Sequence, residues 1–254
     1  MAIIFVISNQ KGGVGKTTTA SSLICGLTAR KRRVLGIDMD PQGSLGFSLG
    51  VDIESGNSIY EVLCGKIKAK DALINTVHGD ILPSNILLSG AELEFTQSGR
   101  EFMLRDAIAD IKDDYDFIFI DTPPALSILT VNAYTASHQL IIPMVPDILS
   151  LLGISQLKDT IMNVKKFYNS RLEVFGILLT RYSKRVNLAR DVEEMSKEIA
   201  NQLGTVVLPP KIRNNISVAE APAHGESILT YQPNSNAALD YRSLVDYILD
   251  REYA

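Results

Sequence analysis

The chain has 254 residues, of which 46% are apolar, and its formal net charge is −4 at pH 7. That length and apolar content suffice for one sizeable hydrophobic core. Because α/β folds of this size commonly form one domain, we expect a single domain over residues 1–254. The acidic balance excludes a protein whose whole surface binds polyanions, so any contact with nucleic acid must come from a local basic patch.

The first residues form an apolar run with no basic stretch before it, which is not the pattern of a signal peptide. No apolar run in the sequence is long enough to cross a bilayer. The two cysteines, Cys25 and Cys64, lie far apart and outside any CxxC spacing, as expected of buried free thiols in a reducing compartment. We therefore expect a cytoplasmic protein without a membrane partner.

Apolar runs and amphipathic segments alternate along the chain. Continuous apolar runs such as 117–120 indicate strands that are covered on both faces. The alternation predicts an α/β fold with a doubly wound, mostly parallel sheet flanked by helices, in which ligands bind at the carboxyl ends of the strands. We expect strands near 2–8, 33–37, 80–83, 116–120, 139–144, 174–179 and 205–208, and helices near 16–30, 58–64, 99–112, 127–136, 153–168, 188–202 and 235–250.

A glycine-rich segment follows the first predicted strand and precedes the first predicted helix, which is the context of a phosphate-binding loop. Glycines let backbone N–H groups approach phosphate oxygens, and the helix N-terminus adds a positive dipole. Lys16 is placed to reach the β- and γ-phosphates, and the Thr17 hydroxyl is placed to bind Mg²⁺. The predicted phosphate-binding residues are Lys11, Gly12, Gly13, Val14, Gly15, Lys16, Thr17 and Thr18.

The spacing of this loop departs from the ordinary pattern G-x-x-x-x-G-K-[ST], because its first glycine would fall on Gln10. The segment 11–17 instead fits K-G-G-x-G-K-[ST] and resembles the deviant Walker A P-loop of the ParA/MinD group of ATPases. In that group the first lysine crosses a dimer interface and contacts the nucleotide of the other subunit. The resemblance thus implies a catalytic role for Lys11 beside Lys16, with ATP and Mg²⁺ as cofactors.

Two carboxylates follow the second predicted strand, in the sequence Asp38-Met39-Asp40-Pro41-Gln42. Asp38 and Asp40 alternate along an extended segment and so point to the same side. Aspartates before a proline also cap turns, which is the alternative interpretation. The pattern D-x-D-P-Q matches the ParA family, and the resemblance implies that Asp40 positions the attacking water. We expect Asp38 to support the metal site.

The predicted strand 116–120 is followed by Asp121, in the arrangement of a Walker B element whose carboxylate holds Mg²⁺. The next residues, 122–124, resemble the segment of the family that senses the γ-phosphate. The adenine contacts are expected from the segment that follows the last predicted strand, at Pro209 and Asn215. A further match at 219–225 to the S-E-A-P-x-x-G signature extends the resemblance over nearly the whole chain, and the pattern is most similar to the small chromosomal Soj type.

The resemblance implies a switch in which ATP joins two subunits face to face and slow hydrolysis separates them. ParA-type dimers bind DNA without sequence preference and respond to a ParB-like DNA-binding protein, which implies a nucleoid-associated protein acting in plasmid or chromosome segregation. Two positions that are often basic in relatives are Asn214 and Ser217 here, which favours weaker DNA binding. The predicted DNA-binding residues are Arg181, Lys184, Arg185, Arg190, Lys211 and Arg213.

Two other interpretations stay open at this point, and a third lacks the residues it needs. A ParA-like ATPase that positions another cargo, such as a chemoreceptor array or a microcompartment, has the same switch residues. A MinD-like membrane switch needs a basic amphipathic helix at the C-terminus, whereas 240–252 carries more acids than bases. Iron–sulfur relatives need paired cysteine ligands, which Cys25 and Cys64 do not supply.

Overall fold

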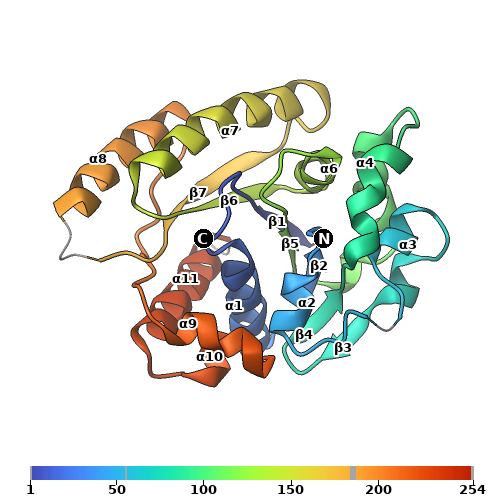
Figure 1. Cartoon of the computed structure of the whole chain (residues 1–254), viewed down its shortest axis with the longest axis horizontal. Coiled ribbons are helices and arrows are strands. Elements are labelled where there is room, and N and C mark those ends of the chain that lie inside the picture. Colours follow the sequence, from blue (N-terminus) through green and yellow to red (C-terminus); the bar gives the residue numbers. More distant parts are fainter. Residues whose placement is uncertain (1, 55, 184–186, 253–254) are drawn as a thin grey trace.

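A computed structural model describes residues 2–54, 56–183 and 187–252. One seven-stranded sheet runs through them in the order β3-β4-β2-β5-β1-β6-β7 (Figure 1). All neighbouring strands are parallel except β3 and β4, so the sheet has the mostly parallel, doubly wound form that the alternating pattern predicts. The strands are β1 Ile3–Ile7, β2 Val34–Asp38, β3 Ile74–Thr76, β4 Gly79–Leu82, β5 Phe117–Asp121, β6 Gln139–Met144 and β7 Glu173–Leu179.

Helices cover both faces of the sheet. Figure 1 shows α1 and α11 on one side and α6, α7 and α8 on the other. The helices are α1 Lys16–Ala29, α2 Ser44–Ser48, α3 Ile59–Leu63, α4 Ala91–Glu94, α5 Met103–Ala107, α6 Ile128–Ala136, α7 Ile148–Phe167, α8 Asn187–Gln202, α9 Ser217–Glu220, α10 Ile228–Tyr231 and α11 Asn236–Glu252.

The central strands are apolar along their whole length because each face of the sheet meets a helical layer. Phe5, Phe117 and Phe119 pack in the core that includes α1 and α11. Ile118 and Ile120, which alternate with the phenylalanines of β5, pack in the core under α6, α7 and α8. The aromatic rings of Phe5 and Phe119 stack with their centroids 5.4 Å apart. This packing fixes the carboxyl ends of β1 and β5 beside each other.

Two predicted elements do not form as one continuous helix or strand. The segment 99–112 forms a 3₁₀ turn at Arg100–Phe102 and the short helix α5 rather than one helix. Gly99 adopts a left-handed φ of 83°, and the Asn132 side chain accepts a hydrogen bond from the Leu104 N–H, so this segment is shaped by a contact with α6. The segment 205–208 forms only an isolated bridge between Val207 and Ile177.

Helix α7 begins five residues before the position expected from the sequence. Asp147 caps it, because its Oδ1 accepts a hydrogen bond of 2.8 Å from the Ser150 N–H. The edge strand β3, which is antiparallel to β4, was not predicted. Within the described residues, no helix combines the length and the apolar character needed to cross a membrane.

Candidate functional site

The segment between β1 and α1 forms an open glycine-rich loop. Gly13 and Gly15 have left-handed φ values of 72° and 85°, which side chains rarely permit. A Cβ on Gly12 or Gly13 would meet no described atom within 4 Å, so the loop faces open space. Among the described residues, no side chain caps the N-terminus of α1, and its first turn contains no acid. Exposed backbone N–H groups and a positive helix end therefore form a site for an anion such as a phosphate.

The two lysines of the loop occupy different surroundings. Lys16 is only 7% exposed, and its Nζ donates a 3.3 Å hydrogen bond to the Lys11 carbonyl oxygen. Burial lowers the pKa of Lys16, while the negative charges of Asp121 and Asp40 oppose this shift. Lys11 extends instead to Asp147, with 2.7 Å between Nζ and Oδ2. In this structure Lys16 is directed into the loop and Lys11 is held outside it.

The Thr17 hydroxyl, at the start of α1, contacts the Asp121 carboxylate at the end of β5. The Thr17 Oγ1 donates a 2.6 Å hydrogen bond to Asp121 Oδ2. Asp121 is fully buried, and its Oδ1 has no hydrogen-bond partner among the described residues. Burial raises the pKa of Asp121 to about 7, although the Thr17 hydrogen bond and the Lys16 charge lower it. A buried oxygen without a partner, next to a hydroxyl, fits a magnesium ion or its bound water.

Asp38 has a different environment from the one its predicted metal role requires. Its Oδ1 accepts a hydrogen bond from the Asp40 N–H, and its Oδ2 accepts bonds from the N–H groups of Leu45 and Gly46. The carboxylate is therefore occupied by the backbone of the loop and by the start of α2. Burial and the neighbouring Asp121 charge raise the pKa of Asp38 well above its ordinary value. We infer that Asp38 shapes the loop that carries Asp40.

We expect Asp38→Ala to destabilise the fold by about 2–4 kcal/mol, because three backbone N–H groups lose their acceptor in a buried place. Chemical denaturation measures the free energy of unfolding. Asp38→Asn is the matched control, since its amide oxygen still accepts hydrogen bonds, and its loss should be smaller. An alanine variant as stable as the wild type would contradict this role.

Asp40 lies half-buried at the start of the same loop. Its Oδ1 accepts a 3.0 Å hydrogen bond from the Gln42 N–H, which is the turn-capping contact considered as the alternative for this motif. Its charge also acts on Lys16 and Asp121, which shows that the three groups share one electrostatic environment. A turn-capping contact and a role at the site therefore coexist in one residue.

A pocket of about 290 Å³ lies beside the P-loop. Its walls come from the loop, from the end of β7 and from the segment before α9. Asn215, a predicted adenine contact, lines the pocket, whereas Pro209 is not among its lining residues. The lining also includes Thr180, whose Oγ1 donates to the Val14 carbonyl oxygen and so fixes the pocket against the loop. The pocket thus adjoins the glycine-rich loop.

The predicted DNA-binding residues differ in their availability. Lys211 lies 2.6 Å from Glu193 Oε1, and Arg213 forms several hydrogen bonds to Asp240. A DNA phosphate would have to replace these ion pairs. Arg181 is exposed, with a φ of 48°, and lines the 290 Å³ pocket beside the loop. Lys184 and Arg185 lie outside the described residues, as does the side chain of Arg190.

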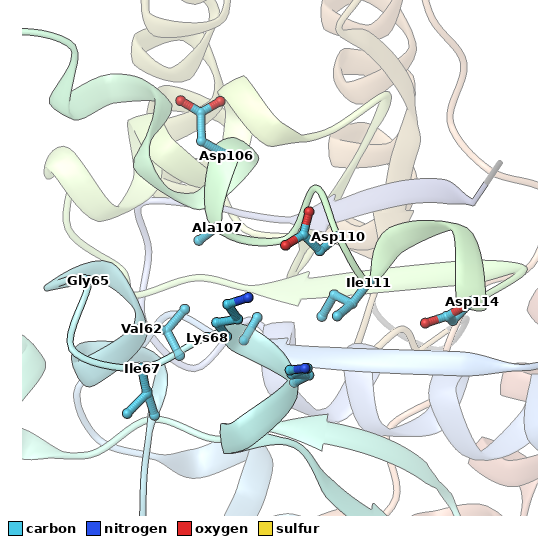
Figure 2. Close-up of a pocket in the computed structure, with 11 residues that line it drawn as sticks. Val62, Gly65, Ile67, Lys68, Asp106, Ala107, Asp110, Ile111 and Asp114 are labelled. Atoms are coloured by element: carbon cyan, nitrogen blue, oxygen red, sulfur yellow. The ribbon is translucent and has the colours of Figure 1, made fainter.

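Figure 2 shows a second hollow, of about 470 Å³, between the α3 region and the α5 region. Asp106, Asp110 and Asp114 line one side of it, and Lys68 lines the other. None of the predicted site residues contributes to this lining. It is therefore separate from the phosphate-binding site, and its exposed charges serve below as control positions.

Three residues at the site were missed in the sequence. The Asn9 amide donates to the Pro143 carbonyl oxygen, and its Oδ1 accepts from the Lys11 N–H, which ties the loop to β6. Thr180 ties it to the end of β7, and Asp147 binds the Lys11 side chain. All three lie at or just beyond a strand end. Their position at strand ends could have marked them as site residues. The sequence did not reveal their partners, because these lie far away along the chain.

The fold and this site define a P-loop nucleotide-binding protein, and the chain matches the family described as AAA domain over residues 1–174. It is 38% identical to the chromosome partitioning protein ParA of Caulobacter vibrioides, over 98% of this chain and 94% of that protein. It is 39% identical to the sporulation initiation inhibitor protein Soj of Bacillus subtilis, over 96% of this chain and 97% of that protein. The chain therefore belongs to the ParA/Soj family of P-loop ATPases.

A solved structure is also similar over the whole chain. The cobyrinic acid a,c-diamide synthase of Mycobacterium smegmatis, crystallised with ADP and magnesium, superposes with a TM-score of 0.88 and 36% identity. The similarity covers 100% of this chain and 96% of that chain. The family resemblance and the doubly wound fold expected from the sequence are thus confirmed.

Proposed function

We propose that this chain is an ATPase that forms a homodimer on binding ATP and Mg²⁺ and acts in DNA segregation. The observation that carries the proposal is the convergence of Lys16, Thr17, Asp40 and Asp121 around one open glycine-rich loop. Relatives named ParA and Soj, similar over nearly their full length, support the assignment to segregation.

The nucleotide would lie with its phosphates in the P-loop and its base in the adjoining pocket. Backbone N–H groups from Gly12 to Thr17 would bind the phosphate oxygens. Lys16 would exchange its weak 3.3 Å bond to the loop carbonyl for the β- and γ-phosphates. Asn215 would lie along the base, where it lines the pocket. Thr18 lines the same pocket at the start of α1.

Thr17 and Asp121 would hold the magnesium ion, which when bound neutralises phosphate charge in the transition state. Asp40 would position the water for attack on the γ-phosphate, with Asp38 fixing the backbone of its loop. Asp40 is the one acid proposed for this role, and its Oδ1 already accepts a hydrogen bond from the Gln42 N–H. Slow turnover that a partner accelerates is therefore expected of this switch.

The dimer would form across the open side of the P-loop. Lys11 projects from the loop away from its own phosphate site, and its side chain is 33% exposed. To reach a second subunit, the Lys11 side chain would leave its contact with Asp147. Two nucleotides buried in one interface would make pairing depend on the γ-phosphate, as expected of a switch.

The dimer would bind DNA without sequence preference through surface cations and respond to a ParB-like DNA-binding protein, which would place it on the nucleoid in the cytoplasm. Of the predicted cations, Arg181 is exposed beside the nucleoside pocket, so nucleotide and DNA sites would be neighbours. The ion pairs of Lys211 and Arg213 favour weak binding.

We expect a random DNA duplex to be retained only with Mg-ATP or a slowly hydrolysed analogue, and not with ADP or without nucleotide. Fluorescence anisotropy at several salt concentrations measures the affinity. Arg181→Ala should weaken binding and reduce the salt slope by about one. Lys70→Ala, at the hollow of Figure 2, is the matched control, and nucleotide affinity is measured in parallel. DNA binding that ignores the nucleotide would contradict the switch.

A ParA-like ATPase that positions another cargo is the second candidate, and the ion pairs of Lys211 and Arg213 are the observation that favours it. An ATP-dependent dimer that fails to bind DNA at low salt would support this function instead. A MinD-like membrane switch is less well supported, because Tyr241, Leu244, Val245 and Ile248 of α11 are buried in the core shared with α1. The apolar face of that helix is thus already covered.

A further inference from the structure

The Lys11 side chain is bound within its own subunit. Its Nζ lies 2.7 Å from Asp147 Oδ2 and 3.2 Å from Ser150 Oγ. The Lys11 and Asp147 side chains are 33% and 34% exposed, so the pair is partly shielded from solvent. This contact joins the P-loop to the N-terminus of α7 across 136 residues of sequence.

The Asp147 carboxylate also caps helix α7. Asp147 Oδ1 accepts the 2.8 Å hydrogen bond from the Ser150 N–H that caps α7. Burial alone would raise the pKa of Asp147, but the hydrogen bonds from Lys11 and Ser150 outweigh it and lower this pKa below its ordinary value. The side chain is therefore charged at neutral pH and fixed by the helix, which makes it a rigid partner for the lysine.

The backbone of Lys11 is fixed from the same side. The Lys11 N–H donates to Asn9 Oδ1, and the Asn9 amide donates 2.7 Å to the Pro143 carbonyl oxygen in β6. The end of β6 thus fixes the Lys11 backbone through Asn9, and Asp147 at the start of α7 holds its side chain. A side chain so placed points along its own subunit and must leave this position before it contacts anything across an interface.

We propose that Asp147 is a positioning residue that holds Lys11 within its own subunit and so opposes nucleotide-dependent pairing until a second copy brings a triphosphate to it. This inference rests on the proposed function, because it assigns Lys11 to the nucleotide of the other subunit. The lysine exchanges one carboxylate for a more highly charged triphosphate when the dimer forms.

The size of the effect follows from the exposure of the pair. A partly exposed ion pair contributes up to about fivefold to an equilibrium constant. Each dimer breaks two such pairs, so the two factors multiply. Removing the Asp147 charge is therefore expected to lower the dimer dissociation constant about tenfold to twentyfold. Ser150→Ala, which removes the weaker contact, should have a smaller effect.

The first experiment tests the contact without requiring a dimer. Trace acylation of lysines in the nucleotide-free protein, read by mass spectrometry, should label Lys11 about threefold faster in Asp147→Asn than in the wild type. Asparagine still caps a helix, so α7 should persist. Lys70 serves as the internal reference. Unchanged labelling of Lys11 would overturn the proposal.

The second experiment measures the dimer dissociation constant with a slowly hydrolysed ATP analogue and Mg²⁺ by analytical ultracentrifugation. Asp147→Asn should dimerise about tenfold more tightly than the wild type. Asp159→Asn, which makes the same charge change on an exposed position of α7, should leave the constant unchanged. If Asp147→Asn dimerises as tightly as the wild type or more weakly, the proposal that Asp147 holds Lys11 back is overturned.

The two experiments separate failure of this inference from failure of the proposed function. If labelling of Lys11 rises in Asp147→Asn but the wild type never dimerises with nucleotide, the proposed dimerising function fails and the switch role of Asp147 fails with it. If the wild type dimerises normally and only the Asp147→Asn effect is missing, the proposed function stands and this inference alone is overturned.

Discussion

Lys16→Ala is expected to weaken binding of ATP and ADP at least about hundredfold. Lys16 is a buried cation of the loop, and its positive charge interacts with the negative charges of Asp121 and Asp40. Losing charge-assisted hydrogen bonds to two phosphates costs about 3 kcal/mol, which corresponds to this factor. Isothermal titration calorimetry with Mg-ADP measures the affinity directly.

The control for this experiment is Lys70→Ala. This variant removes one exposed lysine that lines the hollow of Figure 2. Its affinity for Mg-ADP should equal that of the wild type. Circular dichroism of Lys16→Ala excludes unfolding as the cause of any loss. Wild-type affinity in Lys16→Ala would remove the central residue of the proposed phosphate site.

Asp40→Ala is expected to reduce ATP hydrolysis by about 10²-fold or more while leaving ATP binding intact, so that the dimer persists in Mg-ATP. The factor is that of a residue which positions or deprotonates the attacking water. Because Asp40 makes its described hydrogen bonds through the local turn, its loss should leave the core unchanged. Phosphate release and size-exclusion chromatography with light scattering measure hydrolysis and assembly together.

Asp110→Ala, which removes an exposed acid at the hollow of Figure 2, is the matched control and should hydrolyse ATP at the wild-type rate. An Asp40→Ala protein that stays monomeric in Mg-ATP, or that hydrolyses ATP normally, would show that this aspartate has another role. Its contact with Gln42 would then be the whole of its function.

The parts of the site that were predicted from sequence depend on contiguous residues. The P-loop is one continuous segment between β1 and α1. Its left-handed φ values require glycines, whatever contacts the rest of the fold makes. Asp121 is the last residue of β5, and every position before it in the strand is apolar. These signals are local, so composition and spacing were enough to predict these residues, whose ligand roles stay predictions.

The contacts that the sequence did not reveal join remote segments. Asp38 looked like a second metal ligand, but the start of α2 folds back onto its carboxylate and occupies it. Lys211 and Arg213 looked like free cations, but α8 and α11 bring Glu193 and Asp240 to them. Such pairings depend on how helices pack and leave no mark in the local sequence.

The bounds of the helices and strands also divide into those set by the local sequence and those set by remote contacts. The central strands β1, β2 and β5 were predicted within about two residues, because their apolar runs are short and bounded by turns. The segment 99–112 was predicted as one helix from its apolar spacing. Its break depends on Asn132 in α6, a residue that the local pattern does not include. Tertiary contacts overrode the local preference there.

The most direct test of the dimer switch is the structure of the protein bound to Mg²⁺ and a slowly hydrolysed ATP analogue. Two copies should face each other across the P-loops. The Lys11 Nζ of each copy should have left Asp147 and should lie within ion-pair distance of the other copy's triphosphate. A nucleotide-loaded single copy in which Lys11 still contacts Asp147 and Ser150 would contradict it.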